Sequence, residues 1–263
     1  MLLPVLCLAT ALTAPLLEQR AGQVIVTGDA YRATFRPEVV GLVLDLRAAD
    51  GTWLPVLGPG ARVTLGTYDG QRTASLWGVR STWSLTSLPA AVIIAQQALL
   101  EPASGQAVDL TWVATAAGLL LGWRPSGLTA GAYWFPPRLE LAAGDWDGYR
   151  FWGPQGELHE GSLATLAPVP AYAGVSAWEQ RGDVVPRLAT ELPALVLRSE
   201  SRGLDLGVVL VDYQQAWAGT HSFLQRHTPN HLYLYSGHIK SELAERQRWA
   251  WLAPLPALAA AAA

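Results

Sequence analysis

Hydrophobic and polar residues alternate with a period of two along most of the chain from Gln23 onward. In the segment AYRATFRP, for example, Tyr31, Ala33 and Phe35 are separated by polar residues. This period is that of a β-strand with one buried face. The same pattern predicts strands at Tyr31–Arg36, Val39–Arg47, Trp53–Leu57, Arg62–Tyr68, Ser81–Leu88, Ala91–Leu100, Ala107–Ala114, Gly118–Trp123, Arg138–Leu141, Ala194–Ser199, Leu204–Val211, His231–Tyr235 and Arg246–Leu252.

Clusters of Gly, Pro, Asp and Ser separate these segments, as in Gly58-Pro59-Gly60 and Asp69-Gly70. Many short strands at such spacing are typical of a large antiparallel β-sandwich, and an alternating strand–helix pattern is absent. The sequence therefore predicts an all-β fold with few helical turns, for which Tyr213–Ala218 and Ser241–Arg246 are the candidates. The stretch from Gly144 to Pro193 is less regular and rich in Gly, Pro and aromatic residues.

The two ends of the chain differ from the segment between them. Residues 1–21 open with a short apolar run that holds small residues at Ala9, Ala11 and Ala14, which predicts a secretory signal peptide. Residues 22–253 are expected to form one β-sandwich domain, and residues 254–263 a disordered tail rich in Pro and Ala. The expected location is extracytoplasmic, with no stable membrane span in the mature chain.

Composition excludes some partners and leaves others open. The formal net charge is −3 and Lys240 is the only lysine, so the chain lacks the basic stripe that nucleic-acid binding requires. The only cysteine is Cys7, in the apolar N-terminal run, and no phosphate-binding or dinucleotide-binding motif is present. We therefore expect no cofactor. The twelve tryptophans fit either a large core or an aromatic surface for sugars.

The opening segment resembles the galactose mutarotase-like family of β-supersandwiches. A strand at Tyr31–Arg36 is followed by Val39–Arg47, a turn at Ala49-Asp50-Gly51 and a strand at Trp53–Leu57. The resemblance implies a supersandwich fold and carbohydrate recognition in a groove on the concave sheet. It also makes His231 a candidate for catalysis, because Asn230-His231 is similar to an Asn-His motif of the sugar epimerases. The sequence departs from the family in one respect: the family's catalytic carboxylate comes much later in the chain than that histidine, whereas His231 lies near the C-terminal end of this sequence.

The segment DWDGYRFW is the first candidate for ligand binding. Two carboxylates that are two residues apart in a strand point the same way, and sugars bind where aromatic rings and carboxylates meet. The alternatives are a polar turn with tryptophans in the core, or half of a calcium-binding loop whose remaining ligands are missing. We expect no metal site, and the candidate sugar-binding residues are Asp145, Trp146, Asp147, Tyr149 and Trp152.

Histidines supply weaker candidates for catalysis. His159 beside Glu160 has the groups of an acid–base pair, although a solvated loop explains the same residues. Four of the five histidines fall between His221 and His238 without the spacing of a standard zinc site. Among these, His227 and His231 are expected to converge across a hairpin that turns at Thr228-Pro229-Asn230.

Three functional hypotheses follow. The first is an exported carbohydrate-binding protein whose partner is a saccharide or polysaccharide. The second is a sugar-active enzyme, related to epimerases, lyases or hydrolases, that uses Asp145, Asp147, His159, Glu160 and His231. The third is a structural or interaction protein of the cell envelope, in which the aromatic residues belong to the core or to a protein interface.

Overall fold

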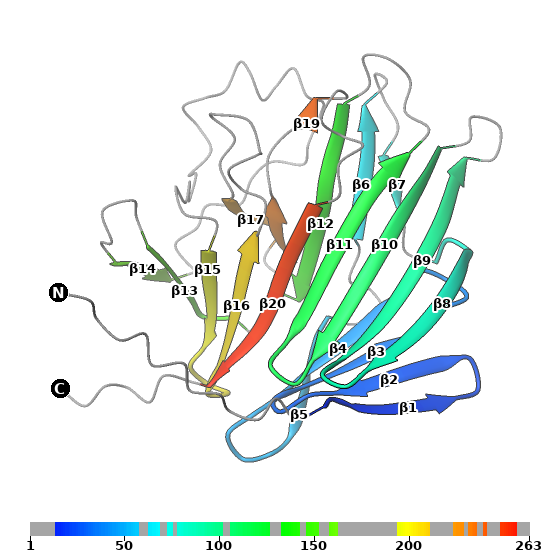
Figure 1. The fold of residues 1–263 in the computed structure, drawn as a ribbon. Helices are drawn as coiled ribbons and strands as arrows, with labels where there is room; N and C mark the ends of the chain where they lie inside the picture. The colour runs from blue at the N-terminus through cyan, green and yellow to red at the C-terminus, as the bar shows by residue number, and fades with distance from the viewer. Residues whose placement is uncertain are drawn as a thin grey trace, which may run out of the picture.

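A computed structural model describes the protein over most of its predicted strands. The described residues are 14–57, 63–68, 73–75, 78–101, 106–126, 133–142, 146–152, 158–162, 194–210, 223–228, 231–235, 239–240 and 248–256. These residues form β-strands joined by turns, and the strands assemble into three antiparallel sheets (Figure 1). The predicted all-β sandwich is therefore confirmed.

The first sheet is a five-stranded meander in which each strand pairs with the next one along the chain. In order across the sheet, its strands are β1 (Leu16–Arg20), β2 (Gln23–Thr27), β3 (Tyr31–Phe35), β4 (Leu42–Arg47) and β5 (Trp53–Leu57). Short turns connect them, which is why consecutive strands become neighbours.

The second sheet has nine strands and collects segments from both halves of the chain. Across the sheet these are β14 (Leu158–Ser162), β13 (Gly148–Trp152), β15 (Ala194–Ser199), β16 (Leu204–Leu210), β20 (Arg248–Pro256), β11 (Leu119–Ser126), β10 (Gln106–Thr115), β9 (Ala91–Glu101) and β8 (Ser81–Leu88). The C-terminal strand β20 lies in the middle, between β16 and β11.

The third sheet is six-stranded within the described part of the chain. Its path of paired strands runs through β17 (Phe223–Thr228), β18 (His231–Tyr235), β12 (Tyr133–Ala142), β6 (Val63–Tyr68) and β7 (Thr73–Ser75), and β19 (Ile239–Lys240) pairs with β12. Figure 1 shows this sheet behind the nine-stranded sheet, and the five-stranded sheet across the lower end of the nine-stranded sheet.

The core lies between the five-stranded and nine-stranded sheets. Alternate residues of β3, including Tyr31 and Phe35, are fully buried. Leu110 and Trp112 of β10 are each only 1% exposed. The rings of Phe35 and Trp112 are 5.6 Å apart between centroids and tilted by 58°. Burial of each such side chain stabilises the fold by about 1.5–3 kcal/mol, so the period-two pattern of the sequence becomes the packing contact between layers.

One buried polar side chain also joins these two sheets. Gln96 of β9 is 3% exposed, and its Nε2 donates to the carbonyl oxygen of Pro37 at 3.1 Å. Its Oε1 accepts a hydrogen bond from Nε1 of Trp112 at 3.0 Å. Both ends of the amide are thus satisfied inside the core, which is the condition for burying a polar group without a large cost.

Most predicted strands are confirmed, and the differences lie where the alternation is weak. The structure adds β1 and β2 before the first predicted strand, a short β7, β13 and β14 within the irregular stretch that begins at Gly144, and β17 and β19 on either side of β18. Residues 163–193 and both predicted helical turns lie outside the described residues. The hairpin predicted to bring His227 and His231 together is confirmed in the backbone, because β17 pairs with β18 and Thr228 lies opposite His231.

The predicted ends of the domain overlap with strands. Strand β1 lies within residues 1–21, and all five of its residues pair with β2. Strand β20 continues to Pro256, three residues into the segment assigned to the tail, and pairs there with Leu204 of β16. The signal peptide stays a prediction. Within the part of the chain that the structure describes, no helix has the length and apolar character needed to cross a membrane.

Candidate functional site

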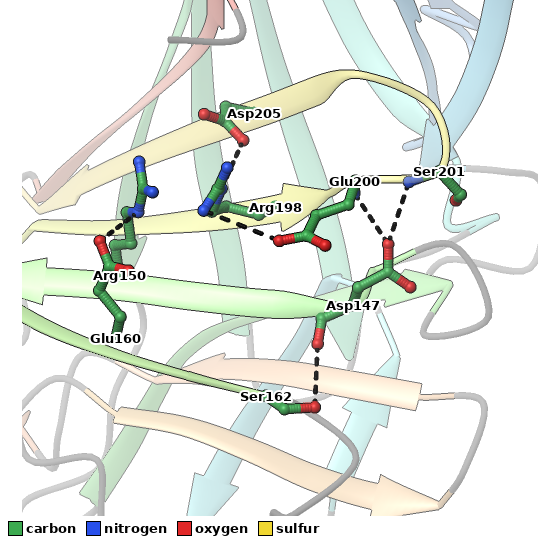
Figure 2. Close-up of polar contacts among 8 residues, drawn as sticks. All are labelled: Asp147, Arg150, Glu160, Ser162, Arg198, Glu200, Ser201 and Asp205. Carbon is green, nitrogen blue, oxygen red and sulfur yellow. Dashed lines mark hydrogen bonds and ion pairs between the residues drawn. The ribbon is translucent and has the colours of Figure 1, made fainter. Parts of the chain in front are cut away.

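The nine-stranded sheet has two different faces. We call the side turned away from the two smaller sheets its outer face. Alternation along β10 puts Leu110 and Trp112 in the core and Asp109 and Thr111 on the outer face. On this face Arg124 of β11 is 55% exposed. Charged side chains gather at the end of the outer face that is formed by β13 to β16 (Figure 2).

Arg198 is the central cation of this group. It lies on β15 opposite Asp205 of β16, and its Nε is 3.5 Å from Oδ1 of Asp205. Its Nη1 is 4.0 Å from the exposed carboxylate of Glu200. The side chain of Arg198 is 23% exposed, whereas that of Asp205 is 5% exposed. Asp205 therefore holds the guanidinium from the buried side, and part of the guanidinium remains accessible at the surface.

A second ion pair lies on the neighbouring strands of the same face. Arg150 of β13 is directly opposite Glu160 of β14, and Nε of Arg150 is 2.7 Å from Oε1 of Glu160. The register also sets Arg150 opposite Val196, two residues before Arg198 on β15. Arg150 and Arg198 therefore occupy the same face, and Figure 2 shows both guanidinium groups on one side of the strands.

Three atoms of this group are buried without a hydrogen-bond partner: Arg150 Nε, Arg198 Nε and Asp205 Oδ2. The fourth such atom among the described residues, Trp146 Nε1, belongs to the core beside β13. The two arginine nitrogens lie near carboxylates, but without the geometry of a hydrogen bond. A buried polar atom without any partner costs about 1–3 kcal/mol, and the ion pairs reduce this cost for the two arginine nitrogens. Exceptions of this kind concentrate at functional sites, and here all four lie on or beside β13 to β16.

A third polar group lies at the other end of the outer face. Asp109 of β10 accepts a hydrogen bond from Gln97 of β9 at 2.9 Å and another from Nη2 of Arg124 of β11 at 2.7 Å. Strand β20 separates the two ends, and its register assigns Trp249 and Trp251 to outer-face positions, opposite Gly122 and Leu120. The outer face thus has polar groups at both ends and two tryptophan positions between them.

The predicted ligand-binding residues fall in different environments. Asp145 lies outside the described residues. Trp146 is 5% exposed and belongs to the core cluster, and Tyr149 packs against that cluster. Trp146 reaches the core because the strand begins only at Gly148, so the alternation does not extend back to it. Tyr149 faces the core by alternation within β13, where it lies opposite the buried Leu197. Trp152 is the last residue of β13, opposite Leu158.

Asp147 binds the backbone of the turn between β15 and β16. Its Oδ2 accepts hydrogen bonds from the backbone N–H groups of Glu200 at 2.8 Å and Ser201 at 3.4 Å (Figure 2). Its own N–H donates to the carbonyl of Arg198 at 2.8 Å. Asp147 therefore fixes the turn between β15 and β16 against the start of β13, and in doing so positions the strand that carries Arg198.

The structure separates the three candidate catalytic residues. Glu160 lies on the outer face in the ion pair with Arg150. His159 is the preceding residue of β14 and so occupies the alternate position of the strand. His231 begins β18 in the six-stranded sheet, opposite Ala142 of β12. These residues do not form one cluster. No group of three or more His, Cys, Asp or Glu side chains is arranged for a metal ion within the described ranges.

Sequence reasoning missed Arg150, Arg198 and Asp205 as site residues. A signal was present, because Arg198 and Asp205 are charged residues within strands that are otherwise apolar, in ALVLRS and LDLGVVL. A charge at an alternate position of such a strand indicates the solvent-facing side. Only the pairing of β15 with β16 shows that these two charges meet.

Comparisons with known proteins give a likeness of fold. No protein-family model matches the chain, and no curated protein matches it. Among solved structures, the chain is similar to the α-N-acetylgalactosaminidase NagBb from Bifidobacterium bifidum in complex with GalNAc. The TM-score is 0.60 at 13% identity, over 88% of this chain and 36% of that one.

Two further structures extend this comparison. A TPR-domain containing protein from Parabacteroides distasonis matches with a TM-score of 0.53 at 9% identity, over 89% of this chain and 47% of that one. A galactose mutarotase-like protein from Clostridium acetobutylicum matches over 92% of this chain and 98% of that one, with a TM-score of 0.45 at 9% identity.

The chain spans about a third of the length of the glycosidase that it matches. At these identities the likeness concerns the fold alone. Galactose mutarotase-like proteins, the family that the opening segment of the sequence resembles, are thus among the matched structures.

Proposed function

We propose that this protein is an exported saccharide-binding protein that binds its ligand on the outer face of the nine-stranded sheet. The observation that carries the proposal is the group of Arg150, Glu160, Arg198 and Asp205 on that face. It contains partly exposed ion pairs and buried polar atoms without hydrogen-bond partners. The fold, which is shared with sugar-related proteins, is consistent with this proposal.

The chemistry of the group favours a neutral, hydroxyl-rich ligand. The two guanidinium groups face three carboxylates, those of Glu160, Asp205 and Glu200, so the group has no excess positive charge that would select for an anionic ligand. Guanidinium N–H groups donate and carboxylate oxygens accept, and a sugar hydroxyl does both. Adjacent hydroxyls of one ring can therefore bridge a guanidinium and its carboxylate partner. Charge-assisted hydrogen bonds of this kind are stronger than those between neutral groups.

The backbone register of β20 is compatible with the same ligand. Trp249 and Trp251 pair with Gly122 and Leu120, between the two polar ends of the face. Sugar-binding sites combine aromatic rings, which contact the C–H faces of the sugar, with a few polar groups that fix its orientation. The proposal concerns binding; the separation of His159, Glu160 and His231 gives no catalytic cluster on which to base a reaction.

Removal of one guanidinium tests this site. We expect Arg150→Leu to weaken saccharide binding by tenfold or more, because a hydrogen bond to a charged group contributes about 1.5–3 kcal/mol. Arg150 is a suitable target because its partner Glu160 is 44% exposed and is not left buried without a partner. Affinity is measured by isothermal titration calorimetry, with N-acetylgalactosamine as the first ligand of a panel of neutral sugars.

The matched control is Arg20→Leu. Arg20 also pairs with an exposed carboxylate, at 2.6 Å from Glu18, but it lies in the five-stranded sheet. It should leave affinity unchanged. Failure of the wild-type protein to bind any neutral sugar would contradict the proposed function, and equal losses in both variants would contradict the proposed site.

A further inference from the structure

Strand β8 forms one of the two edges of the nine-stranded sheet. In Figure 1 this strand lies at the margin of the sheet, next to β9. Six of its eight residues are exposed, and they include Trp83 at 40% and Leu88 at 46%. Exposure of this extent means that β8 is uncovered along most of its length.

The sequence of β8 lacks every common device that protects a sheet edge. Free edges are normally protected by charges, proline, glycine bulges or shortness, because their unpaired N–H and C=O groups otherwise recruit another strand. Strand β8 reads STWSLTSL, and no charged residue occurs from Ser81 to Leu100. It is also eight residues long.

The other sheet edges in the described part of the chain are protected. Strand β1 carries an ion pair between Glu18 and Arg20, at 2.6 Å. Strand β14 carries Glu160, β17 carries Arg226, and β5 contains the exposed Pro55. Strand β7 has only three residues. The absence of protection is therefore a particular property of β8 and not of this fold in general.

The backbone of β8 shows which groups are available for pairing. The N–H of Ser81 donates to the carbonyl of Glu38 at 3.0 Å, on the side away from β9. Alternate residues of an antiparallel strand direct their N–H and C=O groups to the same side. Trp83, Leu85 and Ser87 therefore present their backbone groups outward, at a point where no strand of the described residues pairs with them.

We infer that β8 pairs antiparallel with β8 of a second copy of this chain, so that two nine-stranded sheets become continuous. A two-fold axis at Leu85 places Trp83 opposite Ser87 of the partner subunit and Leu85 opposite Leu85 of the partner subunit. All three are outward-bonding positions, and Ser81, which is already bonded, stays outside the contact. Since the strand carries no charge, self-pairing sets no like charges opposite each other.

The small area of this contact sets the expected affinity of the dimer, and therefore the concentrations at which it can be detected. Interfaces that bury less than about 1,200 Å² in total are typical of weak complexes, and one pair of edge strands belongs to this class. We expect a reversible dimer with a dissociation constant in the micromolar range. Sedimentation velocity of the whole chain, from about 1 to about 200 µM, therefore spans the transition.

The test variant is Ser84→Lys/Thr86→Lys, which adds two exposed charges to the edge. It should raise the dissociation constant at least tenfold. The matched control is Leu16→Lys/Gln19→Lys, which adds the same charge to exposed positions of the edge strand β1 and should dimerise like the wild type. Far-UV circular dichroism checks that each variant folds. If the test variant does not fold, Ser87→Pro replaces it, because this removes one outward N–H and leaves the bonds to β9 intact.

Three results would overturn the inference. One is a wild-type protein that remains monomeric at every concentration, which would leave β8 for another protein partner or for none. Another is a folded test variant that dimerises as the wild type does. The last is an assembly larger than a dimer. Two-fold pairing occupies the β8 edge of both subunits, so it leaves no free β8 edge for a third copy.

Discussion

At the scale of single residues, Tyr31 shows how a polar atom is accommodated in the core. The residue is fully buried, and its hydroxyl donates to the carbonyl oxygen of Thr115 at 2.6 Å, which links β3 to the end of β10. Burial raises the pKa of the Tyr31 phenol well above its usual value, and the negative charge of Asp29 raises it further. The neutral form is thus the form that the fold requires.

A dependence of stability on alkaline pH follows. Below about pH 10 the phenol is neutral in both the folded and unfolded states, so its contribution to stability is fully present. Above about pH 10 only the unfolded state releases the proton, and the free energy of unfolding falls by up to about 1.4 kcal/mol per pH unit from this residue. Tyr31→Phe should lack this decrease, although at neutral pH it is destabilised by about 1–3 kcal/mol through the unpaired Thr115 carbonyl.

Urea unfolding of both proteins from pH 7 to pH 11 measures this difference. The other tyrosines are common to the two proteins and cancel in the comparison. Parallel pH profiles for the wild type and Tyr31→Phe would show that the Tyr31 phenol ionises as readily in the folded state as in the unfolded state.

At the scale of elements, turns dock the two main sheets onto each other. The turn between β2 and β3 begins at Gly28, whose N–H donates to the carbonyl of Tyr31 at 2.9 Å. The next residue, Asp29, donates to the carbonyl of Ala116 in the turn between β10 and β11, also at 2.9 Å. A Cβ at Gly28 would meet the Tyr31 ring and the Ala116 oxygen. Gly28 is therefore needed for close approach between two turns.

We expect Gly28→Ala to reduce the free energy of unfolding by about 1–3 kcal/mol, because the backbone oxygen of Ala116 has no room to move without separating the turns. The comparison is Gly22→Asn. Gly22 has a positive φ of 69°, and no atom lies within 4 Å of the position that a Cβ would take there. Asparagine tolerates this conformation, so the change should stay under about 1 kcal/mol. Chemical denaturation of the two variants measures both values, and equal stabilities would refute the close-approach argument.

At the scale of the whole molecule, the layer arrangement leaves one broad surface for function. Both smaller sheets lie on one side of the nine-stranded sheet, so within the described residues no sheet covers the outer face proposed for the ligand or the β8 edge proposed for the second copy. The two proposed contacts are on different parts of the sheet, because Arg150 and Arg198 lie near the β14 edge and β8 forms the opposite edge. Binding and dimerisation are therefore compatible.

The proposed export also concerns the whole chain. Strand β1 begins at Leu16 and pairs with β2 along its full length. Removal of a signal peptide that leaves β1 intact must therefore occur before Leu16, at the small residues Ala9, Ala11 or Ala14, and not at residue 21. Intact mass and N-terminal sequencing of the exported protein measure the cleavage site. A mature chain that starts after Arg20 would contradict this prediction, and retention of the whole chain in the cytoplasm would contradict export.

The sequence by itself determined the class of fold and the position of most strands. Alternation in segments such as Tyr31–Phe35 and Leu204–Leu210 reflects burial of one strand face, which is a local property of the chain. The same local logic failed at Trp146, where the strand begins two residues later, at Gly148. It also left open the neighbours of each strand, because pairing between distant segments has no local signature.

Tertiary structure alone decided the composition of the site. Asp205 follows Arg198 by a short turn, whereas Arg150 reaches the same face through the pairing of β13 with β15. The long separation between these segments hides their contact from any local pattern. The unprotected edge of β8 has the same origin, since STWSLTSL is an ordinary strand sequence and becomes an interaction surface only because it lies last in its sheet.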